Sequence, residues 1–110
     1  MLIKDVLFTV TDWSGIDPVE VKGETGTSFC RIFEQGNIRV RKIDYSPKYR
    51  ADHWCGRGHI LLVLEGELVI QLKKDRVYTL SAGMSFQAAD DQEDPHLAYT
   101  EKGATVFIVD

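Results

Sequence analysis

Turn-forming residues interrupt this chain at short intervals, and this spacing restricts its fold more than any other feature of the sequence. The positions are Gly15, Asp17, Pro18, Gly23, Gly26, Gly36, Asn37, Ser46, Pro47, Gly56, Gly58, Gly66, Gly83, Asp94, Pro95 and Gly103. The runs between them are rich in Val, Ile, Leu, Phe and Thr, which favour strands. No window of ten residues repeats apolar side chains with helical spacing, although a short turn is compatible with residues 11–15. The pattern predicts an all-β sandwich or barrel with little or no helix.

The turn positions divide the chain into nine expected strands: 19–23, 28–34, 38–45, 59–64, 67–72, 77–80, 84–88, 96–100 and 105–109. Gly36-Asn37 and Glu65-Gly66 each separate two such runs, so we expect a hairpin at each pair. The run 60–64 is apolar at every position, which predicts a central strand buried on both faces. With 110 residues and no repeat or linker, residues 1–110 are expected to form a single domain.

Charge and hydropathy exclude several classes of function. Thirteen Lys and Arg stand against 17 Asp and Glu, a net charge of −4, which argues against nucleic-acid binding. No apolar run approaches the roughly 18 residues of a membrane span. The first residues lack the basic leader and apolar core of a secretory signal, so we expect a cytoplasmic protein.

The residues that carry chemistry gather between Asp52 and His59. His53, Cys55 and His59 are all odd-numbered, and an extended strand places such positions on one face. Imidazole nitrogen and thiolate sulfur bind borderline and soft metals, so the three form a candidate half-site that His96 could complete. The alternative is that Cys55 is a small buried thiol and the histidines are exposed loop residues, and the pattern leaves both open.

A family resemblance sharpens this expectation. Residues 53–67 read H-x-C-x-x-x-H-x-x-x-x-L-E-G-E, which resembles the first motif of the cupin superfamily. In an alignment on Gly66, His53 takes the place of the first histidine, Cys55 that of the second, and His59 that of the glutamate. The second cupin motif resembles residues 82–86 followed by His96. The spacing there is about two residues longer than usual, and the usual proline and second glycine are missing.

The chain more closely resembles the small cupins named after an Asp-His-Cys-Trp motif. The matching stretches are 12–13, 23–26, 38–41, 45–47, 51–55, 58–60, 64–67, 83–85 and 107–110. This resemblance implies a conical β-barrel of the jelly-roll type, often dimeric, with a metal in the barrel mouth. It implies no particular reaction.

The expected ligand set is His53, Cys55, His59 and His96. Three neutral imidazoles and one thiolate favour zinc, with copper or iron behind it, over manganese or magnesium. A thiolate ligand is open to oxidation, which makes oxygenase chemistry less favourable here. Four protein ligands would close a tetrahedral site, whereas catalysis needs an open position.

Several other charged residues have two interpretations each. Asp52 could orient an imidazole or be an exposed loop residue. Arg57 could bind an anionic substrate, but a solvent-facing loop charge is favoured. Arg39 and Arg41 share one strand face, which favours a solvated face or a paired interface over substrate binding.

The remaining candidates concern the pocket and the second cysteine. Met84, Phe86 and Tyr99 could line a pocket or simply be core. The acidic run 90–94 is expected to be a solvated loop, with a carboxylate replacing Cys55 as an alternative ligand. Cys30 is expected to be a buried thiol, and a Cys30–Cys55 disulfide is the alternative.

The sequence therefore predicts a single-domain metal-binding cupin, a homodimer, that binds or acts on a small molecule. A non-catalytic ligand- or metal-binding module and a structural metal site are the alternatives, and whether the chain is an enzyme stays open.

Overall fold

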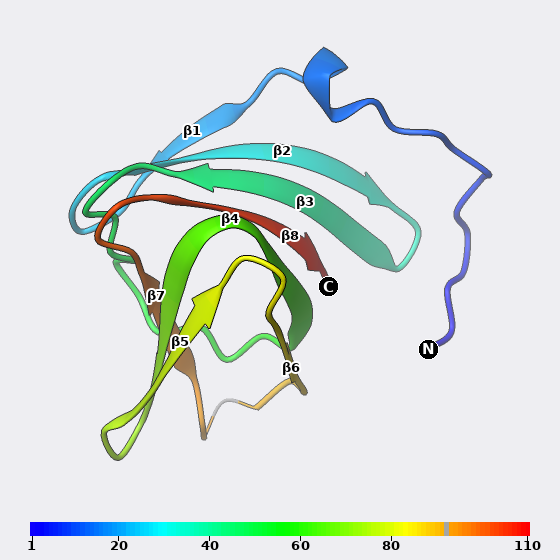
Figure 1. Ribbon diagram of the computed structural model, residues 1–110. Helices are drawn as coiled ribbons and strands as arrows, with labels where there is room; N and C mark the ends of the chain where they lie inside the picture. The colour runs from blue at the N-terminus through cyan, green and yellow to red at the C-terminus, as the bar shows by residue number, and fades with distance from the viewer. Residues whose placement is uncertain (92) are drawn as a thin grey trace.

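The computed structural model describes residues 1–91 and 93–110 and confirms the all-β prediction (Figure 1). The strands are β1 (Val19–Lys22), β2 (Thr27–Gln35), β3 (Ile38–Tyr45), β4 (His59–Leu72), β5 (Arg76–Ser81), β6 (Ser85–Ala88), β7 (His96–Tyr99) and β8 (Ala104–Val109). A 3-10 turn, η1 (Trp13–Gly15), lies where a short turn is expected, and the Asp12 side chain caps it by accepting from the Ser14 amide. Within the described residues, no helix has the length and apolar composition needed to cross a bilayer.

All strand pairs are antiparallel, and they form one path in the order β1-β2-β3-β8-β4-β5, with β6 and β7 also paired to β4. The first half of β4 pairs with β6 and β8, and its second half pairs with β5 and β7. Figure 1 shows β1, β2, β3 and β8 as one curved layer, with β4 arching away from it towards β5 and β7. Two facing sheets therefore share one long strand. The path of paired strands stays open from β1 to β5 among the described residues.

One of the two expected hairpins forms and the other does not. Gln35 pairs with Ile38 across Gly36, whose φ of 56° suits a tight turn. Glu65-Gly66 was expected to reverse the chain in the same way, and this prediction is wrong because β4 runs through it for 14 residues. Gly66 has φ 77°, and the register to β8 shifts between Val63 and Glu65. The glycine marks a bulge, where β4 bends from one sheet into the other.

The core fills the space between the two sheets. It contains Cys30, Ile43, Leu61, Val63, Leu68, Ile70, Leu80, Ala104, Val106 and Ile108. The prediction that residues 60–64 are buried on both faces is wrong for the single chain, because Ile60, Leu62 and Leu64 are exposed. These three side chains point outward, and no other strand of residues 1–91 and 93–110 packs over this face of β4.

The N-terminal residues form an extended arm, defined here as residues 1–12, which runs along the outside of the β2–β3 hairpin (Figure 1). The Asn37 side chain accepts from the Lys4 amide and donates to the Leu2 carbonyl, which fixes the beginning of the arm. Just beyond the arm, Trp13 packs edge-on against Phe107 with ring centroids 6.0 Å apart. Phe8, in contrast, is 97% exposed, so the arm leaves apolar surface uncovered.

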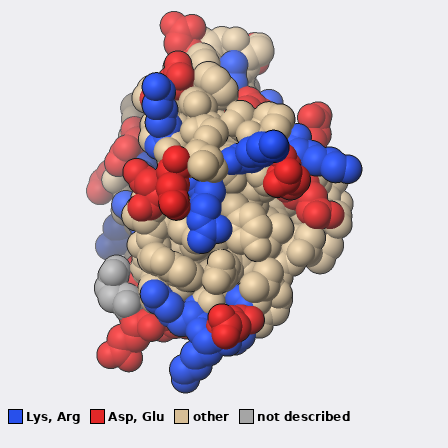
Figure 2. All heavy atoms as spheres, turned by 90° about the vertical axis from the view of Figure 1, so that its left-hand side faces the viewer, with Lys and Arg blue, Asp and Glu red and all other residues tan. Residues whose placement is uncertain are grey.

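Charged side chains of both signs are mixed on the molecular surface shown in Figure 2. Lys and Arg side chains lie among Asp and Glu, and a broad area between them carries neither. On this face the basic groups are not gathered into the single surface that phosphate backbones require.

Gly66→Ala tests the bend in β4. A Cβ at Gly66 would lie 2.3 Å from the Gly103 carbonyl oxygen at positive φ, whereas one at Gly83 would have positive φ but no atom within 4 Å. We expect Gly83→Ala to lower the free energy of unfolding by about 1–2 kcal/mol, and Gly66→Ala by roughly 1–3 kcal/mol more because of overpacking. Urea denaturation measures both. A Gly66→Ala variant as stable as Gly83→Ala would contradict this account of the bend.

Candidate metal centre and its arginine cluster

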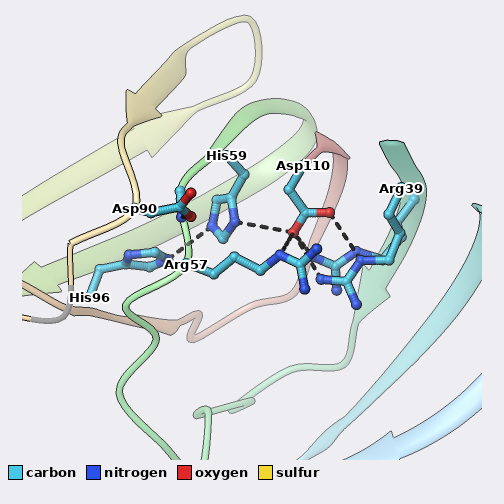
Figure 3. Close-up of polar contacts among 8 residues, drawn as sticks. Arg39, Arg57, His59, Asp90, His96 and Asp110 are labelled. Atoms are coloured by element: carbon cyan, nitrogen blue, oxygen red, sulfur yellow. Dashed lines mark hydrogen bonds and ion pairs between the residues drawn. The ribbon is translucent and has the colours of Figure 1, made fainter. Parts of the chain in front are cut away.

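Two buried histidines from different sheets meet inside the molecule (Figure 3). His59 is the first residue of β4 and His96 the first residue of β7. Their Nε2 atoms lie 2.9 Å apart, and the rings are edge-on with centroids 4.8 Å apart. Phe86 of β6 packs against both rings, at 5.7 and 5.5 Å between centroids. Packing on three strands therefore fixes both imidazoles.

Burial keeps both imidazoles in the neutral form. It lowers the pKa of His59 to about 4, and the proximity of His96 acts in the same direction, while Asp110 opposes both. Burial also lowers the pKa of His96, followed by the effect of His53. A neutral imidazole keeps a nitrogen lone pair, which is the form that binds a metal.

A carboxylate and three arginines lie on the other side of His59 (Figure 3). Arg39 donates from Nε and Nη2 to the two oxygens of Asp110, at 3.0 and 2.8 Å. Arg41 Nη2 lies 3.2 Å and Arg57 Nε 3.4 Å from Asp110 Oδ2. The Asp110 side chain is only 1% exposed. Burial would raise its pKa, but the Arg39 hydrogen bonds and the neighbouring guanidinium charges outweigh burial and hold the pKa below its ordinary value.

Asp110 also approaches the candidate site directly. Its Oδ2 lies 3.5 Å from Nδ1 of His59, which has no hydrogen-bond partner among the described residues. The nearby carboxylate favours the tautomer with the proton on Nδ1, so that the Nε2 lone pair of His59 points towards His96.

Within the described part of the chain, the side chains of the other two expected ligands, Cys55 and His53, form no hydrogen bond with the His59–His96 pair. Cys55 forms a two-way backbone bridge with His96, at 2.8 and 2.9 Å. His53 lies on an exposed loop, where its Nδ1 is 2.7 Å from Asp52 Oδ1. Residues 53–58 are not a strand apart from the bridge at Cys55, so the same-face argument from alternation was wrong there. Among residues 1–91 and 93–110, no cluster of three or more His, Cys, Asp or Glu side chains is arranged to hold a metal.

All four candidates nevertheless line one cavity between the sheets. Its volume is about 330 Å³, and core side chains such as Leu61, Ile70 and Ile108 form its apolar wall. The groups that could bind a metal or an anion are Arg39, Arg41, His53, Cys55, His59 and His96.

The arginine cluster corrects the sequence prediction. The predicted solvated face for Arg39 and Arg41 is wrong, because their side chains are 24% and 18% exposed and form ion pairs with Asp110. Alternation along β3 could have indicated their inward position, since Arg39, Arg41 and the core residue Ile43 share one face of the strand. Arg57 is half-exposed on its loop, as the solvent-facing interpretation expected, yet still approaches Asp110. Asp110 is not among the candidate site residues that the sequence indicates.

The structure also shows the state of both cysteines and the contacts of the acidic run 90–94. Cys30 is a buried thiol, as expected, and both cysteines are free rather than joined in the alternative disulfide. In the run 90–94, Asp90 accepts from the Gly58 amide at 2.6 Å and Asp94 pairs with Arg76 at 2.6 Å. Gln92 lies outside the described residues.

The three possible pocket residues have different environments. Phe86 lines the cavity, Tyr99 lies under the Arg50 guanidinium at 5.4 Å, and Met84 is exposed. The interpretation of Met84 as core is therefore wrong.

The histidine pair fits a metal in the chemistry of its donors. Two imidazole nitrogens bound to one tetrahedral zinc at Zn–N of about 2.05 Å would be about 3.3 Å apart. The observed 2.9 Å requires only a small rotation of the rings.

Comparisons with known proteins identify the fold. Neither a scan of family models nor a search of curated proteins gives a match. An RmlC-like cupin from Shewanella frigidimarina is similar in structure, with TM-score 0.72, 16% identity, and coverage of 90% of this chain and 86% of the other. A sugar phosphate isomerase from a cupin superfamily, from Silicibacter pomeroyi, is similar with TM-score 0.72 and 14% identity, and the match covers 92% of this chain and 74% of the other. Fe(II)-HppE with an alternative substrate is similar with TM-score 0.72 and 13% identity, and the match covers 94% of this chain and 60% of the other.

The pH dependence of stability tests the environment of His59. Because its pKa is near 4 when folded and about 6.5 when unfolded, the unfolded chain binds more protons between these values. We expect the unfolding free energy of metal-free protein to change little between pH 7 and about pH 8 and to fall as pH decreases from 6.5 to 4. Urea denaturation across this range measures it. His59→Gln should flatten the slope, and an unchanged slope would show that other groups produce it.

Proposed function

We propose that this chain, which has the cupin fold, is a small metal-binding cupin whose cavity receives a small molecule. The proposed ligands are His53, Cys55, His59 and His96. The observation that carries the proposal is the convergence of two neutral, buried imidazoles, with Nε2 atoms 2.9 Å apart, at the wall of a cavity of about 330 Å³.

The position of this pair supports a ligand role over an ordinary core role. Two histidines side by side in an apolar core lose hydration at both rings, and His59 Nδ1 has no hydrogen-bond partner among the described residues. A metal would take the place of the proton shared between the two Nε2 atoms, and the Asp110 carboxylate would strengthen the His59–metal bond through Nδ1–H.

Zinc is the first candidate for the metal. Imidazole and thiolate donors favour zinc, copper or iron over magnesium and manganese. Both thiols are free, which suits a reducing compartment such as the cytoplasm. Fe(II)-HppE, one of the proteins of similar fold, is described with ferrous iron, so iron stays a candidate.

The bound ion would act as a Lewis acid on an oxygen of the small molecule. The chain's own residues would supply the surroundings. Asp110 would fix the His59 tautomer, Phe86 would hold both imidazoles in place, and the apolar wall would exclude water from the reacting groups.

A structural metal site is the second candidate function. Four closed protein ligands with no exchangeable position would stabilise the fold without chemistry in the cavity. The cavity beside the histidines favours an open site instead. A water exchangeable on the bound ion supports ligand binding or catalysis, whereas a closed tetrahedron whose removal collapses the melting temperature supports the structural role.

Metal content of variants tests the ligand set. We expect zinc bound per chain, measured by mass spectrometry after purification without added metal, to fall sharply in His59→Ala, His96→Ala, His53→Ala and Cys55→Ala. Circular dichroism should show the fold retained. Cys30→Ala is the matched control, because it removes a buried thiol of the same cavity that is not a proposed ligand.

Full occupancy in His96→Ala or His53→Ala would defeat the assignment. Magnesium or manganese in the wild-type protein would contradict the argument from donor softness.

We also propose that two copies of the chain associate through the outer face of β4. Rows of apolar residues cross this face, since Val109 pairs with both Val40 and Ile60, and Phe107 pairs with Leu62. The arm covers the Val40 end of the first row, while Ile60 at the other end is exposed. Each copy thus carries an uncovered apolar face and an arm with the exposed Phe8, so two copies could cover one another.

Leu62→Glu tests this association. A charge in the proposed interface should convert a dimer into a monomer, halving the mass measured by light scattering, because a buried unpaired carboxylate is strongly disfavoured. Val77→Glu on β5 is the control, since Val77 is also exposed but lies in the other sheet. A wild-type monomer, or a Leu62→Glu variant that remains dimeric, would refute this interface.

A further inference from the structure

We infer that the cavity binds a small organic anion, whose carboxylate or phosphate oxygens are held by Arg41 and Arg39. The inference extends the proposed function, because it names the chemical class of the molecule that would lie beside the metal.

The charge of the arginine cluster is the first support. Arg39, Arg41 and Arg57 carry three positive charges, and the negative charges close to them are Asp110 and Glu34, which pairs with Arg39 across β2 and β3. The chain as a whole has a net charge of −4. Arg39 alone matches Asp110 with two hydrogen bonds and balances its charge. Two further guanidinium groups exceed what is needed to hold one carboxylate, and an excess of partly buried positive charge favours an anion.

The unused hydrogen bonds of Arg41 are the second support. Arg41 gives Asp110 a single hydrogen bond from Nη2, and its Nε is buried without a partner among the described residues. A guanidinium has five N–H donors in a planar fork that matches carboxylate and phosphate oxygens. The Nε itself is buried, so an oxyanion in the cavity would bind the other N–H donors of this guanidinium, whose side chain is 18% exposed and lines the cavity.

The position of the two arginines is the third support. Arg39 and Arg41 line the same cavity as His59 and His96, so one small molecule can contact the arginines and the metal centre together. Asp110 is almost fully buried, whereas the side chains of Arg39 and Arg41 are 24% and 18% exposed and line the cavity. The apolar wall formed by Ile70 and Leu61 would contact the carbon skeleton of the ligand.

Titration calorimetry on metal-free wild-type protein, dialysed free of chelator, tests the inference. The probes are succinate, inorganic phosphate and glycerol, which represent a carboxylate, a phosphate and a neutral polyol of small size. We expect saturable heat from succinate or phosphate and none from glycerol, and the tighter of the two anions identifies the oxyanion. Equal binding of all three, or none, would overturn the inference.

Arg41→Met should weaken binding of the preferred anion about tenfold or more, equivalent to about 1.4 kcal/mol. Lys42→Met is the matched control, because it removes the same charge from the next residue of β3, whose side chain faces away from the cavity. Arg41→Lys is a second variant that keeps the charge beside Asp110, so the fold is preserved, while the planar fork is lost. It should bind the anion several-fold more weakly, and wild-type affinity in both Arg41 variants would refute the assignment.

His96→Ala separates this inference from the proposed metal site. If the arginines form the anion site, this variant should lose zinc but still bind the anion. Loss of zinc in His96→Ala with no anion binding to wild-type protein would support the metal and reject the anion site. Anion binding by wild-type protein that binds no metal would support the anion site and reject the metal site.

Discussion

The bend of β4 at Gly66 is the constraint on which the two-sheet architecture and the candidate site depend. Before the bend, β4 pairs with β6 and β8, and after it with β5 and β7, so that a single strand joins two facing sheets. His59 starts this strand, and His96 starts the strand that pairs with its far end. If the chain reversed at Gly66 instead, these histidines would have no reason to meet. Backbone contact with Gly103 leaves no room for a side chain there.

The second organising element is the buried Asp110. A carboxylate that is 1% exposed is stable only when its charge is compensated, and Arg39 and Arg41 on β3 provide this compensation across the cavity wall. The same carboxylate approaches His59, so the ion-pair cluster and the histidine pair are electrostatically linked. This linkage explains how one small cavity can offer neutral imidazole nitrogens on one side and cationic donors on the other. The metal and anion proposals concern adjacent parts of one site.

Particular residues show which parts of the fold and of the candidate site could be predicted from the sequence. Turn spacing and β-forming runs predicted nearly every strand, because these signals are local. The runs 59–64 and 67–72 were correctly assigned as strands, but the intervening Glu65-Gly66 was assigned as a hairpin, since a glycine at positive φ serves a turn and a bulge equally well. Alternation predicted one face for His53, Cys55 and His59, yet it applies only within a continuous strand, and residues 53–58 are a loop. His96 was selected by residue type, and its contact with His59 depends on pairing across 37 positions.

The amino-acid sequence by itself determined the fold class, the strand order along the chain and the residue types available for a metal. These depend on short-range preferences that act within a few residues. The tertiary structure alone decided which face of β3 is the inside, and therefore that Arg39 and Arg41 are cavity residues rather than a solvated stripe. It also brought Asp110 from the last strand's end to His59 at the start of β4. Such contacts arise from strand pairing between distant segments, whose register is set by the burial of the whole core rather than by any local pattern.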